Sequence, residues 1–242
     1  MNVGDLFERL SFGEFNDHTI GMEGEGDIDP NHQSKVISHA NNALTELFSK
    51  FTHNKDYVKL RLLEGLQRYR ITAANALSVD PVNGFIMDTE QEPYTDNLIK
   101  ILGIKVLDDP ETIVNEGMGL SLNRRDIEDT TMRIKTLNYR TLFIEDPVPG
   151  RVIEIEYQAK HPKLVTPADL SQEIDIHPVL ETALEAHIAY QSFGSMNGEA
   201  HLAKSRILWG RYQQICERVD LEDLLQETDN SDYDRLHQKG FK

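Results

Sequence analysis

Apolar residues recur every three or four positions along two N-terminal stretches of the chain, the spacing of a helix that buries one face. The first stretch predicts a short helix over residues 3–10, and the second predicts a long helix from Asn31 to Phe51. Asp29 followed by Pro30 is a typical helix start, because aspartate caps the first turn and proline fits the first helical position. The glycine-rich acidic segment Gly21–Asp29 is predicted to be a loop.

The same spacing returns in two stretches near the C-terminus. It predicts one helix over His177–Ser195 and a second that follows Asn197, has Glu199 in its first turn and runs to about Val219. The segment Gly194–Gly198 interrupts the pattern, and Asn197 is the predicted N-cap of the second helix. Two helices joined by so short a loop pack antiparallel, so a helical hairpin is expected.

Between these helical regions the apolar period changes to two, which is typical of strands with one buried face. One predicted hairpin has strands at 57–62 and 66–71, joined by a Glu-Gly turn. A second has strands at 139–145 and 151–159, joined by a turn that two prolines make rigid.

The segment between the two predicted hairpins has a mixed pattern. It predicts a short helix over residues 94–102 and a strand over Ile104–Leu107. Leu120 and Leu122 fit a strand, and residues 126–136 fit either a helix or a long loop.

Helices towards both ends and strands in the middle predict an α+β fold. We expect a helical bundle, made of the long N-terminal helix and the C-terminal antiparallel helical hairpin, beside a β-rich hairpin domain and an extended C-terminal arm. The predicted segments are an N-terminal helical part at 1–55, a β-rich domain with an irregular insertion at 56–165, the C-terminal helices at 166–219 and an acidic arm at 220–242.

The formal charge of −16 is concentrated near the two ends of the chain. Residues 1–30 and residues 217–234 each hold eight acids and one base, a net charge of −7 apiece. This balance argues against a general basic face that wraps nucleic acid. The acidic segments are either solvated and flexible or act as arms that order on a partner.

The sequence offers no catalytic constellation. It contains no nucleophile elbow, no phosphate-binding glycine loop and no HExxH motif. Cys216 is the only cysteine, which rules out an internal disulfide and fits a reducing compartment. No apolar run approaches the length of a membrane span. We therefore expect no enzyme activity, no cofactor, no metal and no membrane partner.

Two weaker patterns leave alternatives open. The acids at Glu23, Glu25, Asp27 and Asp29 alternate in one loop and could clasp a cation, as a metal-dependent hydrolase or nuclease would require. Lys59 and Arg61 share one face of a predicted strand, and together with Arg124-Arg125 they form local basic zones that could touch phosphates or an acidic partner. The plainer interpretation of both patterns is a solvated surface.

Three segments resemble the head-to-tail connector, or adaptor, proteins of short-tailed phages. The opening residues carry a short helix, the stretch RLSFGE that fits "RLSxGE", a Gly-rich acidic loop and a helix ending in "LxxLxxxF". The run VIEIEYQAKHPKL at 152–164 fits the family's "YxAxHPxL" strand ending, and EIDIHPVLETALEAHIAYQSFGSMN at 173–197 resembles its first C-terminal helix. The resemblance covers roughly residues 1–72 and 139–217.

The resemblance implies a viral structural protein of the virion, located in the tail or neck region and made in the host cytoplasm. Relatives form a ring, usually of twelve copies, between the portal protein and the tail nozzle. They have no cofactor and no catalytic activity. DNA passes through the channel during ejection without sequence-specific binding. A related head-closure or tail-completion protein and a generic soluble regulatory module are the alternatives.

The C-terminal arm carries apolar residues among its charges, a pattern that suits docking through a few buried contacts. We expect this arm to bind the portal protein, so that deletion of residues 220–242 abolishes binding. The expected anchors are Leu221, Leu224, Leu225, Tyr233, Leu236 and Phe241.

Overall fold

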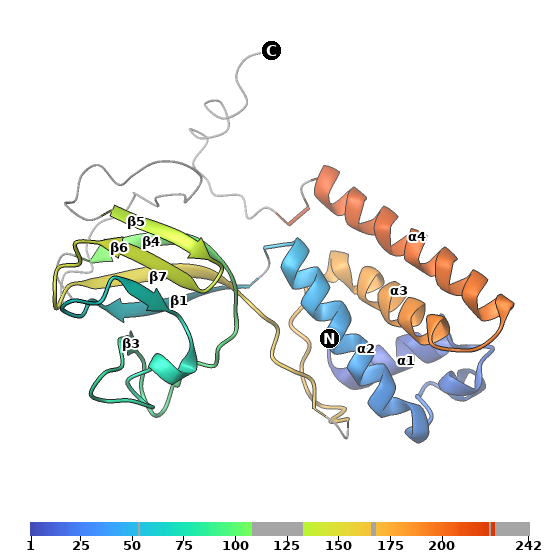
Figure 1. The fold of residues 1–242 in the computed structure, drawn as a ribbon. Helices are drawn as coiled ribbons and strands as arrows, with labels where there is room; N and C mark the ends of the chain where they lie inside the picture. Colours follow the sequence, from blue (N-terminus) through green and yellow to red (C-terminus); the bar gives the residue numbers. More distant parts are fainter. Residues whose placement is uncertain (53, 108–132, 166–167, 223, 226–242) are drawn as a thin grey trace, which may run out of the picture. The chain divides into compact units, whose positions relative to one another are not determined.

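The computed structural model describes residues 1–52, 54–107, 133–165, 168–222 and 224–225. Within these residues the fold is mixed α+β with two antiparallel sheets, which confirms the predicted class (Figure 1). In chain order the elements are α1 (Val3–Phe12), the 3₁₀ helix η1 (Thr19–Gly24), α2 (Pro30–Lys50), β1 (Lys55–Arg61), β2 (Arg68–Arg70), the 3₁₀ helix η2 (Ala73–Asn75), β3 (Ile86–Met87), β4 (Leu98–Leu107), β5 (Arg133–Asn138), β6 (Thr141–Glu145), β7 (Val152–Ala159), α3 (Pro178–Gly194) and α4 (Glu199–Leu221). None of the helices in the described part of the chain is long and apolar enough to cross a membrane.

The described residues divide into two compact units. The first contains Met1–Asp5 and the described part of Pro30–Asp175, and the second contains Leu6–Asp29 and the described part of Ile176–Lys242. The first unit thus holds α2 and all the strands, and the second holds most of α1 together with α3 and α4. The four segments predicted from the sequence stay a prediction.

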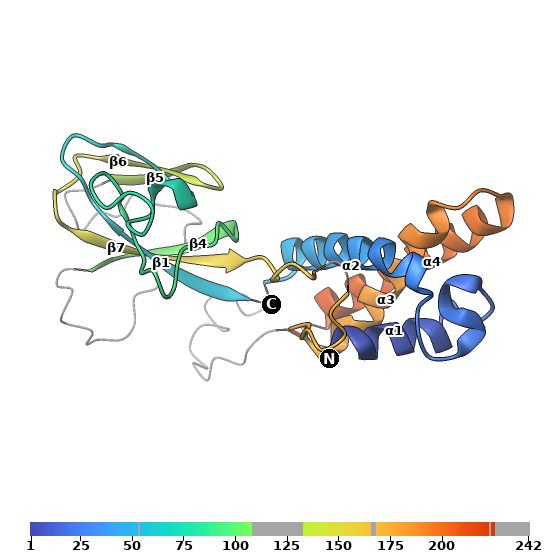
Figure 2. The same cartoon turned by 90° about the horizontal axis from the view of Figure 1, so that it is seen from below.

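The strands of the first unit form two sheets over one core. The four-stranded sheet has the order β3-β1-β7-β4 and the three-stranded sheet has the order β2-β6-β5. One buried cluster combines residues of both sheets, among them Leu60 and Ile155 from the first and Tyr69 and Leu142 from the second. The sheets therefore stack face to face over this core, as Figure 2 shows for β6 and β5 above β1 and β7.

Both predicted hairpins are wrong in their pairing, although their strands exist. β1 and β2 lie in different sheets, and so do β6 and β7. β1 instead pairs with β7 along its whole length, from Lys55 opposite Gln158 to Arg61 opposite Val152. The turn between β1 and β2 and the turn between β6 and β7 each lead the chain from one sheet to the other. The two strands on either side of each turn therefore cover the same core from opposite sides.

β4 replaces the short helix predicted over residues 94–102, so that prediction is wrong. Its buried residues Leu98, Ile101 and Ile104 are three positions apart, which imitates a helical face. The register against β7 shifts between Leu98 and Lys100 and again between Ile101 and Gly103. Each irregularity resets the alternation of a strand, which explains the misleading spacing.

The prediction of a helix or loop over residues 126–136 is wrong from Arg133 on, where β5 begins. Residues 126–132, Leu120 and Leu122 lie outside the described residues. The 3₁₀ helix η1 overlaps the first four residues of the loop predicted over Gly21–Asp29, but the backbone of Gly21, Met22 and Glu23 is not helical, so the segment is irregular, as expected of a loop.

The four predicted helices are confirmed within about two residues at each end. The predicted N-cap Asn197 is wrong, because the cap of α4 is Gly198. Gly198 has a backbone φ of 120°, a conformation that residues with a side chain rarely adopt. A glycine at this position therefore lets the chain turn sharply into α4.

In the second unit α3 and α4 pack side by side (Figure 1 and Figure 2). The rings of His187 and Tyr212 lie 4.8 Å apart, and those of Tyr190 and Trp209 lie 4.9 Å apart. Positions later in α3 thus meet positions earlier in α4. Because these rings are large and in contact, they fix the facing sides of the two helices.

Candidate functional site

The predicted portal-binding residues fall at and beyond the end of α4. Leu221 is the last residue of this helix, and its side chain is 85% exposed. Leu224 is also exposed, and its amide donates a hydrogen bond to the carbonyl oxygen of Val219 at 3.2 Å. This bond ties the backbone that follows α4 to the last turn of the helix. Tyr233, Leu236 and Phe241 lie outside the described residues.

The residues that carry the "RLSxGE" resemblance make tertiary contacts in the second unit. The Arg9 guanidinium forms ion pairs with Glu181 and Glu185 of α3. The Ser11 hydroxyl donates to the carbonyl oxygen of Gly21 at 2.7 Å. Glu14 pairs with Arg211 of α4 through its carboxylate. The motif thus connects α1 and the following loop to both long helices.

The "YxAxHPxL" residues make contacts in the first unit. The backbone of Leu164 exchanges two hydrogen bonds with the side chain of Asn41 on α2, at 2.8 and 3.1 Å. The ring of His161 contacts that of Phe48 at 5.5 Å, and its Nε2 accepts a hydrogen bond from the amide of Asp175. This motif therefore joins the end of β7 to α2.

The two weaker sequence patterns are the acidic loop that contains Glu23–Asp29 and the basic zones that contain Lys59 and Arg124-Arg125. Among the described residues, no three His, Cys, Asp or Glu side chains are grouped so that they could hold a metal ion. Lys59 stands opposite Glu154 of β7, and the charged atoms of the two side chains are 4.0 Å apart. Arg124 and Arg125 lie outside the described residues.

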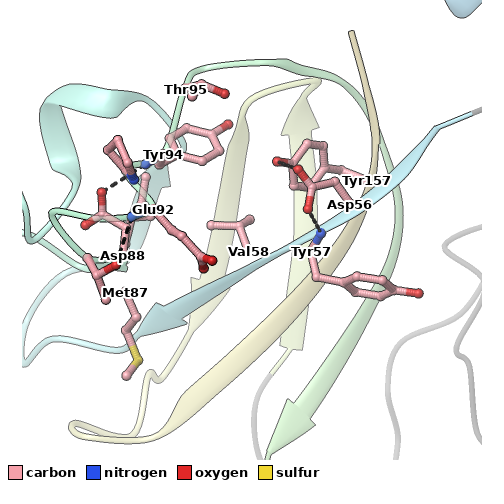
Figure 3. Close-up of a pocket in the computed structure, with 12 residues that line it drawn as sticks. Asp56, Tyr57, Val58, Met87, Asp88, Glu92, Tyr94, Thr95 and Tyr157 are labelled. Atoms are coloured by element: carbon pink, nitrogen blue, oxygen red, sulfur yellow. Dashed lines mark hydrogen bonds between the residues drawn. The ribbon is translucent and has the colours of Figure 1, made fainter. Parts of the chain in front are cut away.

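A hollow of about 360 Å³ opens in the first unit, beside one end of the four-stranded sheet (Figure 3). It receives residues from β1, from β3, from the loop after β3 and from β7. The lining residues are Asp56, Tyr57, Val58, Ile86, Met87, Asp88, Thr89, Glu92, Pro93, Tyr94, Thr95 and Tyr157. Sequence reasoning missed this site, because its residues come from separate stretches and match no motif.

Hydrogen bonds among three side chains, those of Tyr157, Asp56 and Asn97, stabilise one wall of the hollow. The Tyr157 hydroxyl lies 2.8 Å from the Asp56 carboxylate, to which it donates, and 2.8 Å from the side-chain oxygen of Asn97. Burial raises the pKa of Tyr157 well above its ordinary value, and its hydrogen bond to the negative Asp56 raises that pKa further. The phenol therefore stays protonated and remains a donor at physiological pH.

The opposite wall is the loop that follows β3. Asp88 accepts hydrogen bonds from the amide and hydroxyl of Ser78, at 2.9 and 2.5 Å, and from the amide of Tyr94 at 3.0 Å. Burial works to raise the pKa of Asp88, but these donors more than offset it and hold the pKa below its ordinary value. The carboxylate thus stays charged and fixes the shape of the loop.

No family model matches the chain, and no curated protein matches it either. The chain's own residues and the resemblance of its motifs are therefore what bears on its function. Two features stand out from the geometry: the motif residues that make tertiary contacts in each unit, and the hollow beside the sheet.

Replacing Tyr157 with phenylalanine is expected to destabilise the first unit by about 1 kcal/mol, because the half-buried Asp56 carboxylate loses a donor. The measurement is amide hydrogen exchange in β1 and β7. Tyr57→Phe is the matched control, since this neighbouring tyrosine on β1 is 57% exposed. Equal effects of the two substitutions would contradict the role assigned to the Tyr157 hydroxyl.

Proposed function

We propose that the chain is a virion structural protein that forms the head-to-tail adaptor ring between the portal protein and the tail nozzle. The observation that carries this proposal is that the motif residues behind the resemblance make tertiary contacts. Arg9 and Glu14 join the N-terminal segment to α3 and α4, Ser11 holds the loop after α1 through Gly21, and His161 and Leu164 join β7 to α2. Motifs that maintain tertiary structure are what a structural protein needs, whereas catalytic motifs would leave polar groups presented to a substrate.

In this proposal α2, α3 and α4 form the helical bundle of the adaptor family, and α3 with α4 is its C-terminal hairpin. Copies associate head to tail into a ring, usually of twelve in the family. Such a contact joins two different surfaces of the same chain, so it needs no self-complementary patch. The central channel passes DNA, and acidic side chains on its wall would keep the phosphates from adhering.

The test is to mix the purified chain with the portal protein encoded in the same genome. Light scattering after size-exclusion chromatography and negative-stain images give the stoichiometry and the position. We expect a ring of this chain seated on the tail side of the portal. A complex in which the chain sits elsewhere would favour another head-closure or tail-completion role, and a chain that stays monomeric with portal would refute the adaptor proposal.

The C-terminal arm gives a sharper prediction. Replacing Leu221, Leu224 and Leu225 together with serine is expected to abolish portal binding in a pull-down, as deletion of residues 220–242 should. The reason is that apolar anchors supply most of the affinity of such an arm. The matched control replaces Val79 and Val82, which are also exposed but lie in the first unit. Undiminished binding of the leucine variant would overturn the assignment of the arm.

A further inference from the structure

Two Asn-Gly pairs occur in the chain. Asn83-Gly84 lies in the loop between η2 and β3, and Asn197-Gly198 lies in the turn between α3 and α4 (Figure 1). An asparagine followed by glycine can cyclise readily, because glycine carries no side chain that hinders the approach of its amide nitrogen to the asparagine Cγ. The sequence alone gives the two pairs the same reactivity, and the structure separates them.

Both reacting groups of Asn83-Gly84 are held by Asp80. The side-chain amide of Asn83 donates to the Asp80 carboxylate at 3.2 Å, and the backbone amide of Gly84 donates to the Asp80 carbonyl oxygen at 2.8 Å. Gly84 is buried, and a Cβ added there would come within 2.9 Å of the Ala76 carbonyl oxygen. Cyclisation at this pair therefore requires a local opening that breaks both hydrogen bonds.

The same two groups of Asn197-Gly198 are accessible. Both residues are exposed, and within the described part of the chain neither the Asn197 side-chain amide nor the Gly198 backbone amide makes a hydrogen bond. A Cβ added to Gly198 would approach the ring of His201 at 3.6 Å, an ordinary contact distance. The carbonyl oxygen of Gly198 accepts a hydrogen bond from the amide of Leu202 at 3.1 Å. The Gly198 nitrogen can therefore move toward Asn197 without breaking a hydrogen bond of its own.

We propose that Asn197 is a site of spontaneous deamidation. The Gly198 nitrogen loses its proton and attacks Cγ of Asn197, so that a new N–C bond closes a succinimide ring. The bond between Cγ and Nδ2 breaks, and Nδ2 leaves as ammonia with a proton that replaces the one lost by the amide. Water then opens the ring at one of its two carbonyls, which gives either aspartate or isoaspartate. The reaction needs no cofactor, and each product carries a negative charge that asparagine lacks.

The position of the turn makes both products compatible with the fold. The new carboxylate precedes the first turn of α4, where the helix dipole favours a negative charge. Isoaspartate lengthens the backbone by a single carbon, in a turn where Asn197 and Gly198 are both exposed. Copies of the chain therefore gain a charge in this turn as they age, while α3 and α4 stay packed. This inference does not depend on the adaptor proposal.

The test is to incubate the full chain at pH 8 and to follow both pairs over time by peptide mapping with mass spectrometry. Deamidation at Asn197 is expected to be at least about tenfold faster than at Asn83, the factor that corresponds to breaking one buried hydrogen bond. The same incubation in concentrated urea is the control, because both pairs are then unfolded and should react at similar rates. Equal rates in the folded chain, or a faster reaction at Asn83, would overturn the proposal.

Variants connect the two rates to the structure. Asn197→Gln should abolish the reaction at this position on the same timescale, because glutamine would have to close a larger ring. Asp80→Ala removes the carboxylate that holds the Asn83 side chain, so the rate at Asn83 should rise severalfold while the rate at Asn197 stays unchanged. Asp169→Ala is the matched control, since this exposed aspartate accepts similar local hydrogen bonds from Ser171. If Asp80→Ala leaves the rate at Asn83 unchanged, or if Asp169→Ala raises it equally, the structural basis of the proposal is overturned.

Discussion

Replacing Gln158 with glutamate is expected to destabilise the first unit by about 3 kcal/mol at neutral pH, because a charge is buried among acceptors. Gln158 is 2% exposed, and its side-chain Nε2 donates to the carbonyl oxygens of Phe48 and Phe51. Phe48 lies in the last turn of α2 and Phe51 directly follows its last residue, Lys50, so both carbonyls lie at the helix end, where backbone oxygens lack partners within the helix. A carboxylate would face both oxygens without a hydrogen to donate.

The pH dependence of this variant provides a second check. Burial would raise the pKa of the new carboxyl in the folded state above its unfolded value of about 4.3. The destabilisation relative to the wild type is therefore small below that pH and grows as the pH rises through the folded pKa. Amide hydrogen exchange in α2, β1 and β7 measures it. Gln91→Glu, at an exposed position, is the matched control; a similar loss in both variants would refute the capping role of Gln158.

The helices were predictable from the sequence because the signals that define them are local. Asp29-Pro30 marks the start of α2, and the apolar stripe that follows stays in phase to its end. The break at Gly194–Gly198 likewise separates α3 from α4. Spacing together with a start or stop signal in the same segment delimited these helices, whereas spacing alone was misleading over residues 94–102, where β4 lies.

Strand partners were not predictable in the same way, since pairing is a property of segments far apart in the chain. Leu60 of β1 and Tyr69 of β2 alternate as a hairpin would require, but both point into a core that lies between two sheets. Alternation reports which side of a strand is buried and not which strand lies next to it. In β4 even the alternation is lost at the two register shifts.

The hollow was missed for a related reason. Asp56 and Tyr157 are about a hundred positions apart and become neighbours only because β1 pairs with β7. Tyr94 and Glu92 lie in a stretch with no regular pattern. By contrast, the motif residues Arg9 and Glu14 were identified from the sequence as part of a resemblance. Their ion-pair partners on α3 and α4 could be identified only from the folded structure.

Replacing Arg9 with methionine is expected to destabilise the second unit by about 2 kcal/mol at pH 8, which allows for screening because the Arg9 side chain is 40% exposed. Its guanidinium pairs with Glu181 and, at 2.6 Å, with Glu185. These two carboxylates are mostly buried and one turn apart on α3. Without Arg9 they would repel each other with little solvent to screen them. Denaturation followed by the fluorescence of Trp209, which lies in this unit, is the measurement.

The dependence on pH and a second substitution distinguish lost charge pairing from lost packing. Burial raises the pKa of Glu185 above its ordinary value, while Arg9 lowers it, so removal of Arg9 raises that pKa further. A raised pKa of a carboxyl favours the folded state when the carboxyl is protonated, and this advantage is lost as the pH rises through the pKa of the folded state.

The loss of stability in Arg9→Met should therefore shrink as the pH falls toward 5, and Glu185→Gln should suppress this loss at pH 8. Arg206→Met, at an exposed position of α4, should have little effect. A defect that is the same at both pH values and unaffected by Glu185→Gln would mean that Arg9 acts through packing of its aliphatic stem.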